Sequence, residues 1–238
     1  MKNNWNYIKT FLLIGAAFFL FAFAKQRNNA RVLSEVNLHF TNSENLYLTE
    51  EAVNKLLIQN EVRAKSVGKE ALDLSKVESI LEAHDMIENA EVFVSVDGKM
   101  GAEITQRKPL ARVLGNRDFY LDRKGSKMPL SNYYSARVPL VTGVSEVQLQ
   151  EVYPLMEFIS KDSFLTKHVT GLHRQVNGRY EIYLRQHDFI VFLGAVKDIE
   201  LKFKNFKAFY RKALKDQQLE AYKKVDLQFG NQVVCTKK

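Results

Sequence analysis

Three patterns of hydrophobic positions divide the chain. Residues 11–24 form one apolar run without a charge, residues 31–107 mix helical and alternating spacings, and residues 108–238 contain many short alternating segments. As a helix the first run would span roughly 21 Å, which is short for a bilayer core of about 30 Å, so flanking residues must extend it. The pattern predicts an α+β protein with a single N-terminal transmembrane helix.

The flanks of the apolar run support two interpretations. We expect a cytoplasmic tail over residues 1–9 and a transmembrane helix over residues 10–26, with the amine of Lys9 reaching the interface. The expected anchoring residues are Trp5, Tyr7, Phe11, Phe18 and Phe21. A cleaved signal peptide is the alternative, because Lys2 precedes the run and Ala22-Phe23-Ala24 fits a cleavage site. Both interpretations export the rest of the chain, and a buried soluble helix is a weaker third one.

Residues 31–107 predict a small unit with the element order β-α-α-β-β. Apolar residues alternate over residues 31–40, as in a half-buried strand. Thr49 is expected to cap a first helix, and Ser75 is expected to open a second one through a Ser-Lys-Val-Glu capping box. Alternation over residues 92–104 surrounds Asp97-Gly98, a two-residue hairpin turn. Two helices can then cover one face of a three-stranded sheet.

Residues 108–238 predict a larger mixed β-sheet domain with flanking helices. Short apolar runs indicate strands near residues 110–114, 120–121, 138–143, 168–174, 180–184 and 189–193. A helix is expected within residues 144–160, with Val147 on its apolar face. The last two strands are expected at residues 225–229 and 232–235, joined by a turn at Gly230-Asn231.

Residues 199–214 have the spacing of an amphipathic helix. The opposite face is strongly basic and consists of Lys202, Lys204, Lys207, Arg211, Lys212 and Lys215. Such a helix can lie on an anionic membrane, but packing on a sheet with solvated lysines is the commoner arrangement. The formal net charge of +8 likewise permits anionic lipid, wall polymer or nucleic acid as a partner, and export disfavours nucleic acid.

The titratable residues do not form a recognisable catalytic constellation. There are no evident paired carboxylates and no nucleophile with a base, so we expect no enzyme, no cofactor and no small-molecule substrate. Cys235 is the single cysteine, which excludes an internal disulfide and a multi-cysteine zinc site. It is expected to be a small buried hydrophobe. His84 with Asp85, and the histidines at 168, 173 and 187, are expected to be ordinary polar residues rather than metal ligands.

Four segments resemble, in order and spacing, motifs of the bacterial cell-division family FtsQ/DivIB. QRKPLARV (106–113) resembles its E-R-x-P-x-A joint, and FYLDRKGSKMP (119–129) resembles its aromatic-hydrophobic-Asp-x-x-Gly segment. VPLVTG (138–143) and VDLQFGNQVV (225–234) resemble its L-P-x-x-x-G and D-L-R-Y motifs. The resemblance implies a POTRA-like domain over residues 31–107 and a β-domain over residues 108–238. At the joint, Pro109 is expected to end the preceding strand, with Arg107 and Lys108 solvated.

The resemblance also implies a function. It indicates a non-enzymatic bitopic scaffold in the inner membrane that binds FtsB-like and FtsL-like proteins in the periplasm, at the division site, and helps control septal peptidoglycan synthesis. One of the last two strands is expected at an open sheet edge, where a partner strand can add. The expected partner-binding residues are Asp226, Gln228, Phe229, Gln232, Val233 and Val234. Gln106 and Gln228 depart from the family's usual Glu and Arg. The alternative function is an exported POTRA-type module for polypeptide handling or outer-membrane assembly.

Overall fold

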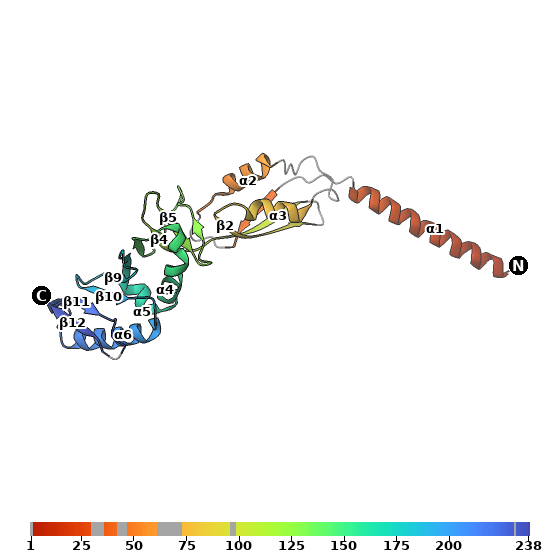
Figure 1. The fold of residues 1–238 in the computed structure, drawn as a ribbon. Coiled ribbons are helices and arrows are strands. Elements are labelled where there is room, and N and C mark those ends of the chain that lie inside the picture. The colour runs from red at the N-terminus through yellow and green to blue at the C-terminus, as the bar shows by residue number, and fades with distance from the viewer. Residues whose placement is uncertain (1, 30–35, 42–46, 61–72, 96–98, 231) are drawn as a thin grey trace. The chain divides into compact units, whose positions relative to one another are not determined.

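A computed structural model describes residues 2–29, 36–41, 47–60, 73–95, 99–230 and 232–238 (Figure 1). The chain divides into two compact units, Met1–Gln106 and Arg107–Lys238. Helix α1 (Lys2–Asn29) contains the stretch Tyr7–Gln26, which is long and apolar enough to cross a membrane and is not buried by protein. This stretch begins earlier than the expected residue 10, because Tyr7 and Ile8 extend the apolar run.

The small sheet follows α1. Strand β1 (Val36–Phe40), helices α2 (Glu50–Gln59) and α3 (Leu74–Glu82), and strands β2 (Ile87–Val94) and β3 (Met100–Gln106) occur in the predicted order. The sheet order is β1-β3-β2, with β1 parallel and β2 antiparallel to β3. Val53, Leu57, Val77 and Leu81 of the two helices are buried, and so are Ala90 and Ile104 of the sheet. The predicted Asp97-Gly98 turn and residues 31–35 lie outside the described residues.

The caps of the two helices differ in how well the sequence predicted them. The hydroxyl of Thr49 accepts a hydrogen bond from the Ala52 N–H at 3.3 Å, as expected. The predicted cap at Ser75 is wrong, because α3 begins one residue earlier and is capped by Asp73, whose carboxylate accepts from the Lys76 N–H at 3.2 Å. Asp and Ser are comparable N-caps, so composition alone could not choose between them.

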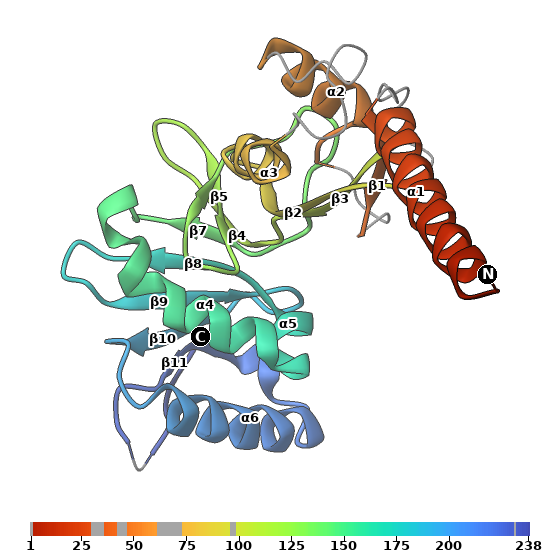
Figure 2. The same cartoon turned by 90° about the vertical axis from the view of Figure 1, so that its right-hand side faces the viewer.

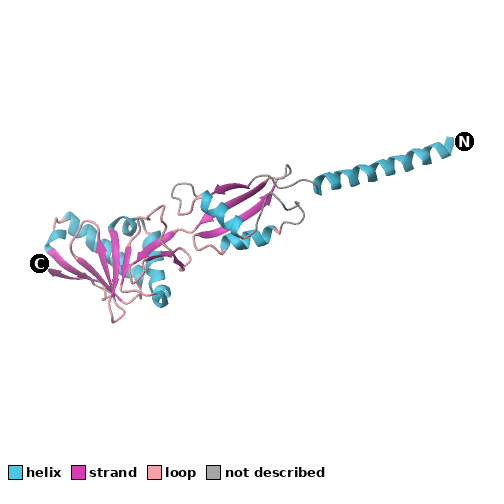
Figure 3. Cartoon of the chain, turned by 90° about the horizontal axis from the view of Figure 1, so that it is seen from above, coloured by secondary structure: helices cyan, strands magenta, loops and turns pink. Residues whose placement is uncertain are grey.

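The second unit contains a nine-stranded mixed sheet of order β12-β11-β10-β9-β8-β7-β4-β5-β6 (Figure 3). The strands are β4 (Pro109–Val113), β5 (Phe119–Asp122), β6 (Lys127–Met128), β7 (Leu140–Thr142), β8 (Val169–Arg174), β9 (Tyr180–Leu184), β10 (Ile190–Gly194), β11 (Tyr222–Asp226) and β12 (Val234–Lys237). The pairs β4–β7, β7–β8 and β10–β11 are parallel, and the other neighbours are antiparallel. The predicted fold class is confirmed.

Three helices of the second unit lie along one face of this sheet (Figure 2). They are α4 (Leu149–Lys161), α5 (Ser163–His168) and α6 (Ile199–Lys215). Their buried side chains, among them Leu155, Leu165 and Phe206, form one apolar cluster with sheet residues such as Val191 and Val225. This cluster is the core of the second unit, and none of the helices described in this unit covers the opposite face of the sheet.

One prediction about these helices is wrong, and one helix was not predicted. Val147 lies in a single 3₁₀ turn (Glu146–Gln148) before α4 and is 89% exposed, so it is not part of the apolar face. Helix α5 was not predicted, since residues 163–168 show too few turns for a periodic pattern. The carboxylate of Asp162 starts it by accepting from the N–H groups of Phe164 and Leu165, each at 3.0 Å.

Helix α6 has the predicted amphipathic form, but its basic face is not uniformly solvated. Lys202 is buried, and its ammonium donates to the carbonyls of Leu193 and Ala195 at 2.9 and 2.8 Å. Burial lowers the pKa of Lys202 from its usual value. Lys207 forms an ion pair with Asp162. Two of the six basic residues therefore hold the helix in place within the unit.

Candidate functional site

The joint segment is held by a buried carboxylate. Asp122 ends β5, and its side chain is 2% exposed. One carboxylate oxygen accepts from the Arg107 guanidinium at 3.0 Å, and the other accepts from the N–H groups of Lys124 and Ser126 at 2.9 and 2.7 Å. The expectation of a solvated Arg107 is therefore wrong: its side chain is only 24% exposed and compensates the charge of Asp122.

Pro109 has a different role from the one predicted. Strand β3 already ends at Gln106, and Pro109 is the first residue of β4, opposite Asp122 of β5. The first position of a strand tolerates proline, because its missing N–H removes no interior ladder bond.

Gln106 is buried, and its side-chain oxygen accepts from the N–H groups of Tyr47 and Leu48 at 2.8 and 3.0 Å.

The candidate partner-binding edge is formed by β12, which is the last strand at one end of the sheet. It pairs on one side with β11, with Asp226 opposite Val234 and Val225 opposite Cys235. Beyond the strand, the Lys238 N–H donates to the Ala221 carbonyl at 2.9 Å, on the side of β11. Because N–H directions alternate along a strand, the N–H groups of Cys235 and Lys237 point to the open side.

The predicted boundaries of these last strands need correction. Strand β11 is Tyr222–Asp226 rather than 225–229, and β12 is Val234–Lys237 rather than 232–235. Gln228, Phe229 and Gln232 therefore lie in the connection between the strands, and Asn231 lies outside the described residues. The connection is tied to α6 by the Asn205 amide, which donates to the Gly230 carbonyl at 3.0 Å.

The predicted partner-binding residues fall into two groups. Phe229 and Val234 are 49% and 40% exposed, and Gln232 is also exposed, so these three are accessible to a partner. Val233 is half-buried and packs against the core cluster. Asp226 accepts from the Gln228 backbone N–H at 3.0 Å and from its side-chain amide at 3.2 Å.

The Asp226 carboxylate also forms an ion pair of 3.1 Å with Lys224. The ammonium of Lys224 lies 4.1 Å from the centre of the Phe192 ring. These contacts join β10, β11 and the connection that follows β11. Asp226 and Gln228 thus shape the edge, while the accessible apolar surface comes from Phe229 and Val234.

A second strand edge, in the first unit, is covered by side chains of α3. Strand β2 lies at the end of the small sheet. Glu78 accepts from the Val92 N–H at 2.9 Å, and Glu82 accepts from the Ala90 N–H at 3.3 Å. Two outward N–H groups of this edge are therefore already used. The sequence analysis missed both glutamates, although their spacing of four on a predicted helix was a usable signal.

The histidines and the cysteine of the second unit have structural contacts, and the rings of His168 and His187 both pack against Tyr210. His173 contacts the Thr142 hydroxyl at 2.8 Å, His168 contacts the Phe164 carbonyl at 2.8 Å, and His187 lies between Glu220 and the Tyr210 hydroxyl at 2.9 and 2.8 Å. Within the described residues, no three His, Cys, Asp or Glu side chains are grouped to hold a metal ion. Burial raises the pKa of the half-buried Cys235 thiol, which disfavours the reactive thiolate.

The comparisons with known proteins assign the second unit to a family. A family model described as "FtsQ/DivIB, C-terminal related" matches residues 108–236, which is more than half of the 238 residues. No curated protein matches the sequence. The match includes the joint strand β4, the buried Asp122 and the candidate edge strand β12 as far as Thr236. The chain therefore belongs to the FtsQ/DivIB, C-terminal related family, a family of cell-division proteins.

Proposed function

We propose that this protein is a single-pass, non-enzymatic scaffold of the bacterial division machinery. Family membership supports a role in cell division, and the apolar stretch Tyr7–Gln26 supports a membrane anchor. In this proposal the part of the first unit that follows α1 and the whole second unit lie outside the cytoplasm. There they bind FtsB-like and FtsL-like partners and help control septal peptidoglycan synthesis.

The proposed binding mechanism is the addition of a partner strand to β12. The observation that carries it is the terminal position of β12 in the sheet, where the N–H groups of Cys235 and Lys237 point outward. A partner strand placed there gains main-chain hydrogen bonds, and apolar side chains beside it add specificity. Phe229 and Val234 supply that apolar surface, with Phe229 as the aromatic anchor.

The covered edge of β2 bears on the alternative function. A POTRA-type module that handles exported polypeptides by strand addition would need a free edge in the first unit. At β2 an incoming strand would have to displace the carboxylates of Glu78 and Glu82 from the N–H groups that they accept. This competition makes β12 a better docking edge than β2, whereas β1, the other end of the small sheet, is left to the pull-down to test.

The test is a crosslinked pull-down of the full chain from native membranes, analysed by mass spectrometry. The affinity tag is inserted in the exposed turn at residues 115–117, because a C-terminal tag would extend β12 and an N-terminal tag would be lost if the apolar segment is cleaved. We compare Lys237→Pro with Lys237→Ala, which removes the same side chain but keeps the outward N–H. The proline variant should lose FtsB-like and FtsL-like partners, whereas the alanine variant should retain them.

A second pair of variants tests the apolar contact. Phe229→Lys should abolish partner recovery, and Val176→Lys, at a fully exposed apolar residue of the same unit, should not. Normal recovery of these partners with Phe229→Lys would contradict the proposed binding edge. Recovery of outer-membrane assembly or secretion proteins instead, together with a new N-terminus at Lys25 in the recovered chain, would favour the exported POTRA module.

A further inference from the structure

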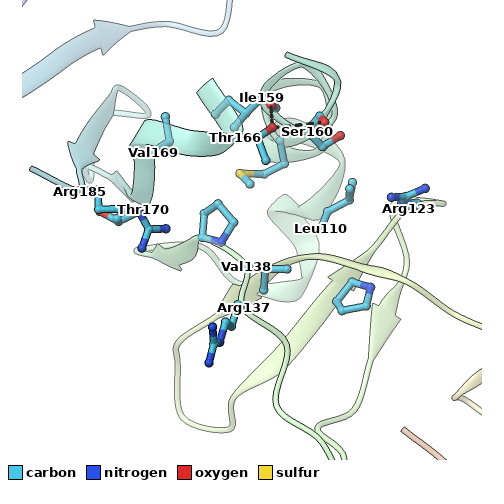
Figure 4. Close-up of a pocket in the computed structure, with 13 residues that line it drawn as sticks. Leu110, Arg123, Arg137, Val138, Ile159, Ser160, Thr166, Val169, Thr170 and Arg185 are labelled. Carbon is cyan, nitrogen blue, oxygen red and sulfur yellow. Dashed lines mark hydrogen bonds between the residues drawn. The ribbon is translucent and has the colours of Figure 1, made fainter. Parts of the chain in front are cut away.

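The second unit has a groove of about 420 Å³ at the amino-terminal ends of three parallel strands (Figure 4). The groove exists because β7 begins beside interior residues of its neighbours β4 and β8 rather than beside their first residues. Leu140, the first residue of β7, pairs with Arg112 of β4 and Gly171 of β8. The first residues of β4 and β8 therefore have no strand between them, and the groove opens at this gap.

The floor of the groove is apolar and comes from three elements. Leu110 belongs to β4, Val169 to β8, and Met156 and Ile159 to α4, and all four are buried. Val138, on the approach to β7, is half-buried and also lines the groove. Because these side chains belong to elements packed in the core, the floor is a preformed surface rather than a set of mobile side chains.

Three exposed arginines surround this floor. Arg123 follows β5, Arg137 precedes β7, and Arg185 follows β9, and Figure 4 shows them on separate sides of the groove. The Nε of Arg185 donates to the Lys167 carbonyl at 3.3 Å, which leaves its terminal nitrogens available. Among the described residues that line the groove, none carries a carboxylate. The groove therefore has a concentrated positive charge without an internal counter-ion.

This combination defines the chemistry of a ligand. Guanidinium groups bind carboxylates with paired, charge-assisted hydrogen bonds. The apolar floor between them requires aliphatic groups, which a sugar-phosphate or polyphosphate chain does not offer. A volume of about 420 Å³ is within the ordinary range of ligand pockets and accommodates a few side chains.

We propose that this groove is a second docking site, for an extended acidic segment of a partner protein in which carboxylate and aliphatic side chains alternate. The carboxylates pair with Arg123, Arg137 and Arg185, and an aliphatic side chain enters between Leu110 and Val169. Strands β9, β10 and β11 separate β8 from β12 in the sheet. The groove therefore binds its ligand independently of strand addition at β12.

The test uses the full chain in neutral detergent micelles and a fluorescein-labelled twelve-residue peptide of alternating Glu and Val. Binding is followed by fluorescence anisotropy, with empty micelles as the blank. The expected result is saturable binding that weakens at least tenfold in the double variant R137E/R185E. The matched control is R117E/R179E, which changes the net charge equally at two exposed arginines outside the groove lining and should shift the Kd less than twofold.

Three results would overturn the proposal. One is no binding at about 1 mM peptide, which corresponds to a free energy too small for a specific site. Another is an equal loss of binding in both double variants, which would show general charge attraction. The last is a groove that binds inorganic polyphosphate, or a peptide of alternating Glu and Ser, as tightly as the Glu-Val peptide. That result would identify a polyanion site in which the apolar floor has no role.

Discussion

The ion pair between Arg107 and Asp122 provides the sharpest quantitative prediction. Arg107→Ala leaves a carboxylate that is 2% exposed without its cation. Breaking a fully buried pair costs about 3–5 kcal/mol. Here Arg107 is partly exposed, and two backbone N–H groups still stabilise the Asp122 charge, so we expect about 2 kcal/mol. Asp122→Ala also orphans those two N–H groups and should cost about 3 kcal/mol.

A double-mutant cycle isolates the pair. Once Asp122 is alanine, removing Arg107 breaks no further contact with Asp122, so the loss of this ion pair is already included in the cost of about 3 kcal/mol, and any other contact of Arg107 contributes to both arms of the cycle and cancels. The coupling energy is then about 2 kcal/mol, which is the sum of the single costs minus the cost of the double variant. Asp122→Asn is the matched background, since it retains an acceptor oxygen for the turn without the charge. In that background Arg107→Ala should cost about 2 kcal/mol less than it does in the unchanged chain.

The assay is urea unfolding of the full chain in detergent, followed by circular dichroism. The reactivity of Cys235 toward a thiol reagent reports unfolding of the second unit specifically, because it is the single cysteine and lies in β12. The reasoning would be refuted if the cost of the double variant equalled the sum of the two single costs to within about 0.5 kcal/mol. That result would mean that Arg107 and Asp122 stabilise the unit independently.

Three further predictions concern other parts of the fold. Gly143→Ala should lower the free energy of unfolding by about 3 kcal/mol or more in urea. The φ angle of Gly143 is +73°, and a Cβ there would clash with the backbone carbonyl oxygen of Arg174. The control Gly115→Ala, which meets no close neighbour, should change it by less than about 0.5 kcal/mol. Replacing Glu78 and Glu82 by alanine should free the β2 edge and produce concentration-dependent self-association in sedimentation, which the matched glutamine pair should not show. Burial raises the pKa of Tyr180 from 10.0 to about 12, so stability from the neutral phenol is full below pH 10 and is lost as pH rises toward 12. Tyr180→Phe should remove that part of the alkaline loss, which urea midpoints at about pH 9 and about pH 11 would reveal.

The local elements were largely predictable from the sequence, and their partners were not. Alternation located β9, and a three-and-four spacing located α6, because both patterns arise within one element. The burial of Lys202 was not predicted, because a lysine on the polar face of an amphipathic helix is expected to be solvated. Its burial follows from the end of β10, where the carbonyls of Leu193 and Ala195 require a donor from α6.

The candidate edge illustrates the same limit. The sequence predicted two final strands but left open which of them lies at an edge. That choice depends on the parallel pairing of β10 with β11, two strands between which the whole of α6 lies in the sequence. Asp122 was likewise recognised only as part of a motif, because its burial depends on the register that places it opposite Pro109. Contacts between segments distant in the sequence determine both results.

The single tryptophan of the chain, Trp5, lies in α1 and is exposed. Its emission therefore reports the surroundings of the N-terminal helix and is insensitive to unfolding elsewhere in the chain. Aromatic side chains of membrane helices gather in the lipid headgroup region. Transfer of the indole from water to that region shifts its emission to shorter wavelength. The protein thus carries a built-in optical probe of its own insertion, readable without any label when the indole is excited selectively, because the other aromatic residues of the chain are tyrosine and phenylalanine.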